Sequence, residues 1–113
     1  MSIVDTIRSD LTTALAWVAD DPVSELAWTA ARRTAEDYLY TRWHAGDLRG
    51  DKPELAYYVK CDHTTMTQND LDLGHFVMQV GVAPTKPAEF VVFTIEFTRP
   101  RPLRPGGGAL PRR

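Results

Sequence analysis

The sequence has little cysteine, histidine or net charge, and it contains no long hydrophobic run. Its 113 residues include one cysteine, Cys61, so an intramolecular disulfide is excluded. The net charge of −2 is unlike that of a general nucleic-acid binder, which is usually basic. No apolar stretch approaches the roughly 20 residues of a membrane-spanning helix, and the N-terminus lacks a signal-peptide pattern. We expect one small soluble domain made in the cytoplasm, with no nucleic-acid partner and no membrane span.

Residues that could support catalysis or bind a metal are few and scattered. Cys61, Asp62 and His63 are adjacent, but a zinc site needs three or four ligands, usually in paired spacings. A cysteine nucleophile would need a histidine beside it in space, and His63 lies two residues further along the end of an expected strand. The glycine tract at 106–108 follows no strand and precedes no helix, so it is unlike a phosphate-binding loop. We therefore expect no enzyme, no cofactor and no metal.

Hydrophobic residues recur at three- and four-residue spacings in the first part of the chain, which predicts two amphipathic helices. The first spans about residues 2–18, with an apolar stripe of Ile3, Val4, Ile7, Leu11, Ala14, Leu15 and Val18. The second begins with Asp21 as its cap and Pro22 at the first helical position, and Gly46 ends it. Its buried stripe comprises Trp28, Ala31, Ala35, Tyr38, Leu39 and part of Trp43. Arg42 lies along this stripe, so we expect its stem to pack and its head to pair or reach solvent.

The remainder of the domain favours strands. We expect strands at 56–61, 75–82 and 89–97, and a loop at 47–54. Between the first two strands, Thr67 and Asp70 form the capping box of a short helical turn. Both faces of the last strand are apolar near its start, so we expect that part to be covered on both sides. The fold class is α+β: two amphipathic helices packed on a small, mainly antiparallel sheet, with an extended C-terminal strand.

The segment after Phe97 differs in composition from the rest. It contains five arginines, no acidic residues, and most of the glycine and proline of the second half of the chain. Such a segment lacks the apolar residues needed for a packed core, so we expect it to be disordered or extended. The sequence therefore predicts a folded domain at 1–97 and a flexible tail at 98–113.

Three stretches of the sequence carry a family resemblance. Residues 60–76 read KCDHTTMTQNDLDLGHF, and residues 80–95 read VGVAPTKPAEFVVFTI. Both resemble the end of the C-terminal domain of tail sheath proteins from contractile phages, tailocins and extracellular contractile injection systems. Residues 27–50, AWTAARRTAEDYLYTRWHAGDLRG, resemble the helix that precedes them in that family. The string GVAPTKPAEFVVF is long and irregular, which makes a chance match improbable.

The resemblance implies a structural subunit that acts through assembly. In the family this domain lies innermost, against the tube, and its final strand extends as an arm that completes a sheet in a neighbouring subunit. The corresponding interface here would be Glu89, Phe90, Val91, Val92, Phe93, Thr94 and Ile95. Arginines that could face acidic groups on the tube are Arg32, Arg33 and Arg42. The expected partners are other sheath subunits, the inner tube protein and a baseplate, within a phage tail or injection-system particle.

Several alternatives stay open. The last strand could fold back as a hairpin partner of 75–82 instead of being donated. Family members carry further domains and an N-terminal arm ahead of this region, whereas Met1 stands almost at the first helix. The chain could therefore be a truncated sheath-like cap or baseplate adaptor, or a stand-alone binding module that uses its arginine-rich tail. His75 and Thr94 stand where the family commonly has basic residues, so the resemblance does not carry the family's charge contacts over to these positions.

Overall fold

A computed structural model describes residues 2–85 and 89–98. The expected tail therefore lies outside the described residues, except for Thr98. The described part is an α+β fold, which confirms the expected class. Its elements are α1 (Ile3–Ala14), the 3-10 helix η1 (Ala16–Asp20), α2 (Glu25–His44), α3 (Pro53–Ala56), β1 (Tyr57–Lys60), α4 (Gln68–Asp72), β2 (His75–Val82) and β3 (Val91–Thr98).

The first helix is shorter than its hydrophobic pattern suggests. The expected helix over 2–18 is divided into α1, which ends at Ala14, and the 3-10 helix η1. Leu15, at the junction of the two helices, and Val18, within η1, are nevertheless fully buried. Ala14 is exposed, so its assignment to the apolar stripe was wrong.

The second helix begins three residues later than its cap signals indicate. Ser24, not Asp21, is the N-cap, and its Oγ accepts a hydrogen bond from the backbone N–H of Ala27 at 3.3 Å. Pro22 lies in the preceding turn, where its carbonyl accepts a hydrogen bond from the Trp28 indole at 2.8 Å. This contact fixes the buried Trp28 against the turn, and it explains why the helix starts beyond the proline. The expected stop at Gly46 is confirmed, because that residue has φ 92° directly after the C-cap.

Three antiparallel strands form the sheet, in the order β1-β2-β3. Tyr57 pairs with Val82 and Lys60 with Gln79, while His75 pairs with Thr98 and Val82 with Val91. The expected strands are confirmed with boundary changes of one or two residues, and the expected loop at 47–54 ends in the one-turn helix α3. The capping box of α4 is also confirmed.

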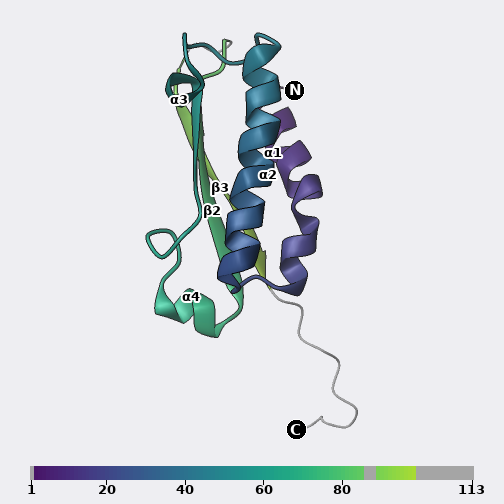
Figure 1. The fold of residues 1–113 in the computed structure, drawn as a ribbon, viewed down its shortest axis with the longest axis vertical. Helices are drawn as coiled ribbons and strands as arrows, with labels where there is room; N and C mark the ends of the chain where they lie inside the picture. The colour runs from purple at the N-terminus through teal and green to yellow at the C-terminus, as the bar shows by residue number, and fades with distance from the viewer. Residues whose placement is uncertain (1, 86–88, 99–113) are drawn as a thin grey trace, which may run out of the picture.

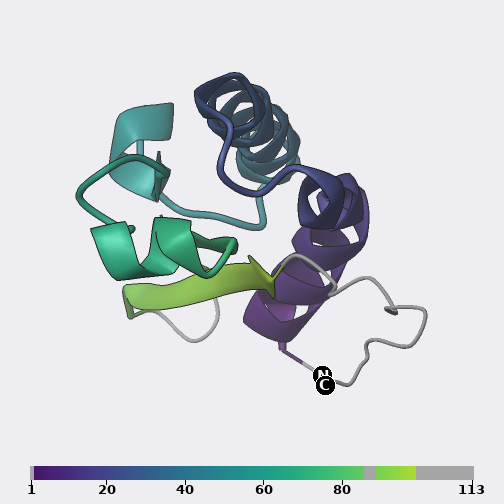
Figure 2. The ribbon, with the colours of Figure 1, turned by 90° about the horizontal axis from the view of Figure 1, so that it is seen from below.

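Both long helices cover the same face of the sheet (Figures 1 and 2). The helix α2 packs against β1, and α1 packs against β3. The guanidinium of Arg8 on α1 lies 5.0 Å from the centre of the Phe93 ring on β3. A single core lies between the layers and includes Ile7, Leu11, Leu15, Trp28, Leu39, Phe76, Met78, Val80, Phe93 and Ile95.

Candidate subunit interface

The strand β3 lies at one edge of the sheet and is paired along one side only. Its eight residues pair with the eight residues of β2, so the described chain folds back as a hairpin. Among the described residues, no strand pairs with the other side of β3. Such an edge presents backbone N–H and C=O groups to which a strand of another chain can add.

The two faces of β3 differ in burial. Phe93 and Ile95 point into the core and are 5% and 3% exposed, whereas Val92, Thr94 and Glu96 on the other face are exposed. Of the seven expected interface residues, Val91–Ile95 lie within β3, and Glu89 and Phe90 precede it. The expectation that the start of this strand is covered on both faces was wrong for the described chain. Both Phe90 and Val92 are 50% exposed, because the helices cover one face only.

An aromatic pair stands on the uncovered face, over a glycine. The rings of Tyr58 and Phe90 stack with centroids 6.0 Å apart, and the Tyr58 hydroxyl donates to Gln79 Oε1 at 2.9 Å. A Cβ atom at Gly81 would come within 2.1 Å of the Tyr58 ring and 2.8 Å of the Phe90 ring. Glycine therefore allows both rings to lie on the sheet. A glycine within a strand is the signal that could have revealed this close approach.

We expect Gly81→Ala to lower the free energy of unfolding by about 1–3 kcal/mol, because the added methyl group overlaps a ring that its hydroxyl contact holds in place. Urea denaturation followed by circular dichroism measures the change. In a Tyr58→Ala background the same substitution should cost at least about 1 kcal/mol less. Equal costs in the two backgrounds would show that the ring is not the obstacle.

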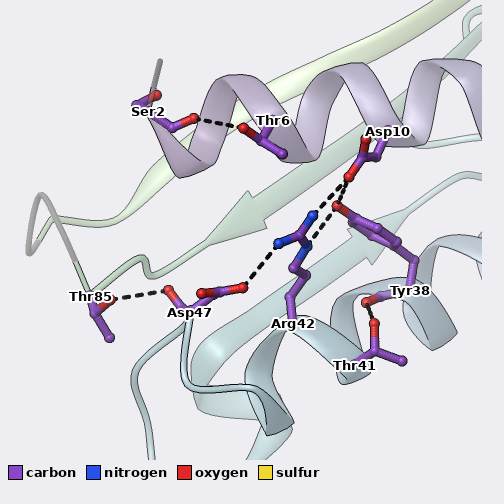
Figure 3. A network of polar contacts seen from close by, with 8 residues as sticks. All are labelled: Ser2, Thr6, Asp10, Tyr38, Thr41, Arg42, Asp47 and Thr85. Atoms are coloured by element: carbon purple, nitrogen blue, oxygen red, sulfur yellow. Dashed lines mark hydrogen bonds and ion pairs between the residues drawn. The ribbon is translucent and has the colours of Figure 1, made fainter.

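Arg42 joins the two long helices to the loop after α2 (Figure 3). Its Nη2 pairs with Asp10 Oδ2 of α1 at 2.9 Å, and its Nη1 pairs with Asp47 Oδ2 at 3.1 Å. Its Nε donates to the Tyr38 hydroxyl at 2.8 Å, and that hydroxyl donates to Asp10. The expectation that the Arg42 head pairs is therefore met within the chain.

The pKa values in this network follow from these hydrogen bonds. Donation from Tyr38, and then from Arg42, lowers the pKa of Asp10 below its usual value. Burial, together with the bond to Asp10, raises the pKa of Tyr38 to about 12. The phenol therefore stays protonated and remains a donor at neutral pH, which favours an intact link between α1 and α2.

The other two arginines of α2, Arg32 and Arg33, differ from each other in their exposure to solvent. Arg33 is exposed on the helix surface, whereas Arg32 is half-buried. Burial raises the pKa of Cys61, and the positive charge of Arg32 opposes that rise. Hydrogen bonds from Thr64 lower the pKa of Asp62, and Arg32 adds to that lowering. The structure thus does not gather Arg32, Arg33 and Arg42 into one patch of free charges, because Arg42 pairs with Asp10 and Asp47.

His75 takes up a bridging position between two carboxylates. Its Nδ1 lies 3.1 Å from Asp70 Oδ1 of α4, and its Nε2 lies 2.8 Å from Glu96 Oε1 of β3. Backbone hydrogen bonding at Thr67 is the main cause that lowers the pKa of Asp70, and His75 contributes further. The contacts connect α4 to both strands near the C-terminal end of β3.

Cys61 and His63, the described residues considered for catalysis, both take part in packing. Cys61 is 2% exposed, and burial raises the pKa of its thiol to about 12, so it is a poor nucleophile. The His63 ring packs edge-on against Trp28, with centroids 5.2 Å apart. Within residues 2–85 and 89–98, no group of three or more His, Cys, Asp or Glu side chains is arranged to hold a metal ion.

A groove that the sequence did not reveal lies around β1, at the sheet edge opposite β3. Its volume is about 480 Å³, and α2, α3 and β1 contribute its walls. The lining includes three carboxylates and three tyrosines: Glu36, Asp37, Glu54, Tyr40, Tyr57 and Tyr58. These residues are dispersed in sequence, and α3 brings Glu54 to the carboxylates of α2 only in the folded chain.

Comparison with protein families decides the identity of this fold. Residues 1–98 match the model of the phage tail sheath C-terminal domain. The chain belongs to that family. Membership of this family accounts for the three stretches that resemble tail sheath proteins. The family consists of structural domains that are typically non-catalytic.

Solved structures support the assignment of the sheath domain. It is similar to a chain of the anti-feeding prophage (AFP) baseplate, with 36% sequence identity, a TM-score of 0.71 and coverage of 80% of this chain. It is also similar to a chain of the PVC sheath complex of an extracellular contractile injection system in the contracted state. There the identity is 33%, the TM-score is 0.70 and 80% of this chain is covered.

The chain spans about a quarter of the length of these solved chains, since it covers 26% of each. A comparison with curated protein sequences gave no match. In the part of the chain that the structure describes, no helix is both long and apolar enough to cross a membrane.

Proposed function

We propose that the chain is a structural subunit of a contractile sheath, assembling by strand exchange with neighbouring subunits and contacting the inner tube. The observation that carries the proposal is the unpaired edge of β3 in a chain of the sheath family. Strand addition at such an edge takes its affinity from backbone hydrogen bonds and its register from alternate side chains. The residues proposed for this contact are those from Glu89 to Ile95.

The hairpin of β2 and β3 bears on how exchange occurs. In the described chain β3 already occupies the place beside β2, so donation to a neighbour would require the eight-residue pairing to open. Addition of a neighbour's strand to the outer edge of β3 needs no such opening. Both routes link subunits through this strand, and they differ in whether the β2–β3 pairing persists in the particle.

Co-assembly tests the proposal directly. The chain is produced together with the full-length sheath and tube proteins of the same machine, and assembled particles are separated by sedimentation. We expect the chain to sediment with the sheath. A chain that stays in the supernatant while sheath and tube assemble normally would overturn the proposal.

The proposed contact of Arg32, Arg33 and Arg42 with the inner tube leads to a separate prediction. Reversal of the charge at Arg32 and Arg33 should reduce co-sedimentation with the tube protein, since an attraction becomes a repulsion. We expect a fall of at least about fivefold at low salt, and a smaller one at 0.5 M salt. Arg42 is left intact because its loss would unpair Asp10 and Asp47 within the fold. Unchanged binding in the double variant would remove Arg32 and Arg33 from the tube contact.

A cap or baseplate adaptor is the second candidate. Its supporting observation is the similarity to a chain of the AFP baseplate, at 36% identity. Such an adaptor would bind at a sheath end. Added chain should then shorten the sheath particles in electron micrographs, whereas an ordinary subunit should be distributed along them.

A further inference from the structure

The groove around β1 is open to solvent and is lined by acidic and aromatic side chains. The groove reaches both faces of the sheet at the edge strand β1, because its lining includes Tyr57, which faces the helices, and Tyr58, which lies on the opposite face. Tyr40 is 47% exposed, so its ring is available for contact. A volume of about 480 Å³ suffices for several side chains of an extended segment.

The carboxylates of this groove, Glu36, Asp37 and Glu54, take part in none of the ion pairs found in the described part of the chain. Their field is felt by Tyr57, whose pKa is raised first by burial and then by the nearby acidic side chains. The groove therefore attracts a cationic ligand with apolar or flat surfaces.

The chain itself contains a segment with this chemistry. Residues 99–105 read RPRPLRP, and the whole of 99–113 has five arginines and no acidic residue. Proline fixes φ and lacks an N–H, so a segment with prolines at 100, 102 and 105 is poorly suited to a strand ladder. Proline-rich segments instead dock through their side chains into grooves lined by aromatic residues. Arginine adds pairing with carboxylates and stacking on tyrosine rings.

We propose that the acidic, aromatic groove around β1 binds the arginine–proline segment 99–105 of a second copy of this chain. The proposal goes beyond strand exchange, since it concerns the opposite edge of the sheet and depends on side chains. It would join neighbouring copies whether the contact at β3 is made by donation or by addition.

The geometry favours a second copy over the same chain. The groove flanks β1 from Tyr57 to Val59, and across the sheet these positions are in register with Val91–Phe93 of β3. Thr98 lies five to seven residues further along β3, about 17–23 Å away in the strand direction. Arg99 and Arg101 follow within three residues, a span of at most about 11 Å. The backbone therefore cannot bring Arg99 or Arg101 level with the groove of the same chain, which favours the groove of another molecule.

A peptide titration tests the contact. The probe is a fluorescent peptide of residues 99–113, and the acceptor is the full-length chain with its five tail arginines replaced by glutamine, so that no internal tail competes. We expect saturable binding in about 50 mM salt. The groove variant Glu36→Gln, Asp37→Asn, Glu54→Gln should weaken it at least about tenfold, because each exposed charge pair contributes roughly a two- to fivefold change in affinity.

The matched control removes three carboxylates elsewhere, by Asp20→Asn, Glu25→Gln and Asp72→Asn. It should change the affinity less than about twofold, since these exposed side chains do not line the groove. Tyr40→Ala should weaken binding about threefold by removing a stacking surface. Equal losses in the groove and control variants would indicate general charge attraction and overturn the proposal. So would absence of binding, or amide chemical-shift changes in the acceptor that lie away from Tyr40, Tyr57 and Tyr58.

Association of the whole chain tests whether the contact joins two copies. The wild-type chain should self-associate in low salt at concentrations above the peptide dissociation constant, and the tail variant should not. A wild-type chain that stays monomeric under these conditions would overturn the contact between copies. If peptide binding fails while co-sedimentation with sheath succeeds, only this inference is wrong and the proposed function stands.

Discussion

Replacing Phe76 with alanine is expected to lower the free energy of unfolding by about 3–5 kcal/mol. Phe76 is fully buried, and its strand β2 is the central strand of the sheet, between β1 and β3. Its ring contacts Phe97, the residue opposite on β3, with centroids 6.0 Å apart. Alanine leaves a cavity in the core, because close-packed neighbours relax only partly.

Phe90→Ala is the matched control, because it is the same chemical change at a phenylalanine that is 50% exposed. It removes one stacked ring from Tyr58 and should cost about 0.5–1.5 kcal/mol. Urea denaturation followed by circular dichroism measures both variants. Since a domain of this size is stabilised by only about 5–15 kcal/mol, the Phe76 variant should be partly unfolded at 37 °C. Similar costs for the two variants would contradict the core described above.

The second large effect is expected at the free edge of β3. The double variant Val92→Lys, Thr94→Lys should reduce incorporation into sheath particles at least about tenfold, while the isolated chain stays folded. Both side chains are exposed on the face that the helices leave uncovered, so lysine is accommodated in the monomer. Lysine on an edge strand opposes pairing with another strand, because the approaching backbone must desolvate the charge.

The control adds the same charge away from the strand, by Thr13→Lys and Ala14→Lys at exposed positions of α1. Co-sedimentation with sheath protein is measured for both double variants, with circular dichroism to verify that each is folded. The α1 variant should be incorporated like the wild-type chain. Full incorporation of the β3 variant would show that this edge is not the assembly contact.

The two predictions separate folding from assembly. Phe76 and Phe90 differ in burial, and the expected costs follow that difference. Val92 and Thr94 contribute little to the core, so their replacement tests the proposed partner contact. In the described chain, β3 has one face that stabilises the domain through Phe93 and Ile95 and one edge that no described strand pairs with.

Much of the fold followed from local patterns in the sequence. The alternation of residues 75–82 and 89–97 predicted β2 and β3 because a strand with one covered face needs apolar residues at every second position. Thr67 with Asp70 predicted the cap of α4, since that contact involves neighbours in the chain. The irregular string from Gly81 to Phe93 indicated the sheath family, which the family match confirmed.

Other features depended on contacts between distant residues. Asp21 and Pro22 were sound local signals for a helix start, but the buried Trp28 uses the Pro22 carbonyl and the helix begins at Glu25. The pattern at the start of β3 could not show that one face is left open, because coverage depends on where both helices pack.

By itself, the sequence determined the main helices and strands to within a few residues, most of the buried stripe of each long helix, and the family. These properties depend on local spacing and on side-chain polarity. Only the tertiary structure decided that β3 pairs with β2 yet leaves one edge free, that Gly81 makes room for two rings, and that three carboxylates meet three tyrosines around β1. Each of these results from side chains far apart in the chain, whose positions are set by packing.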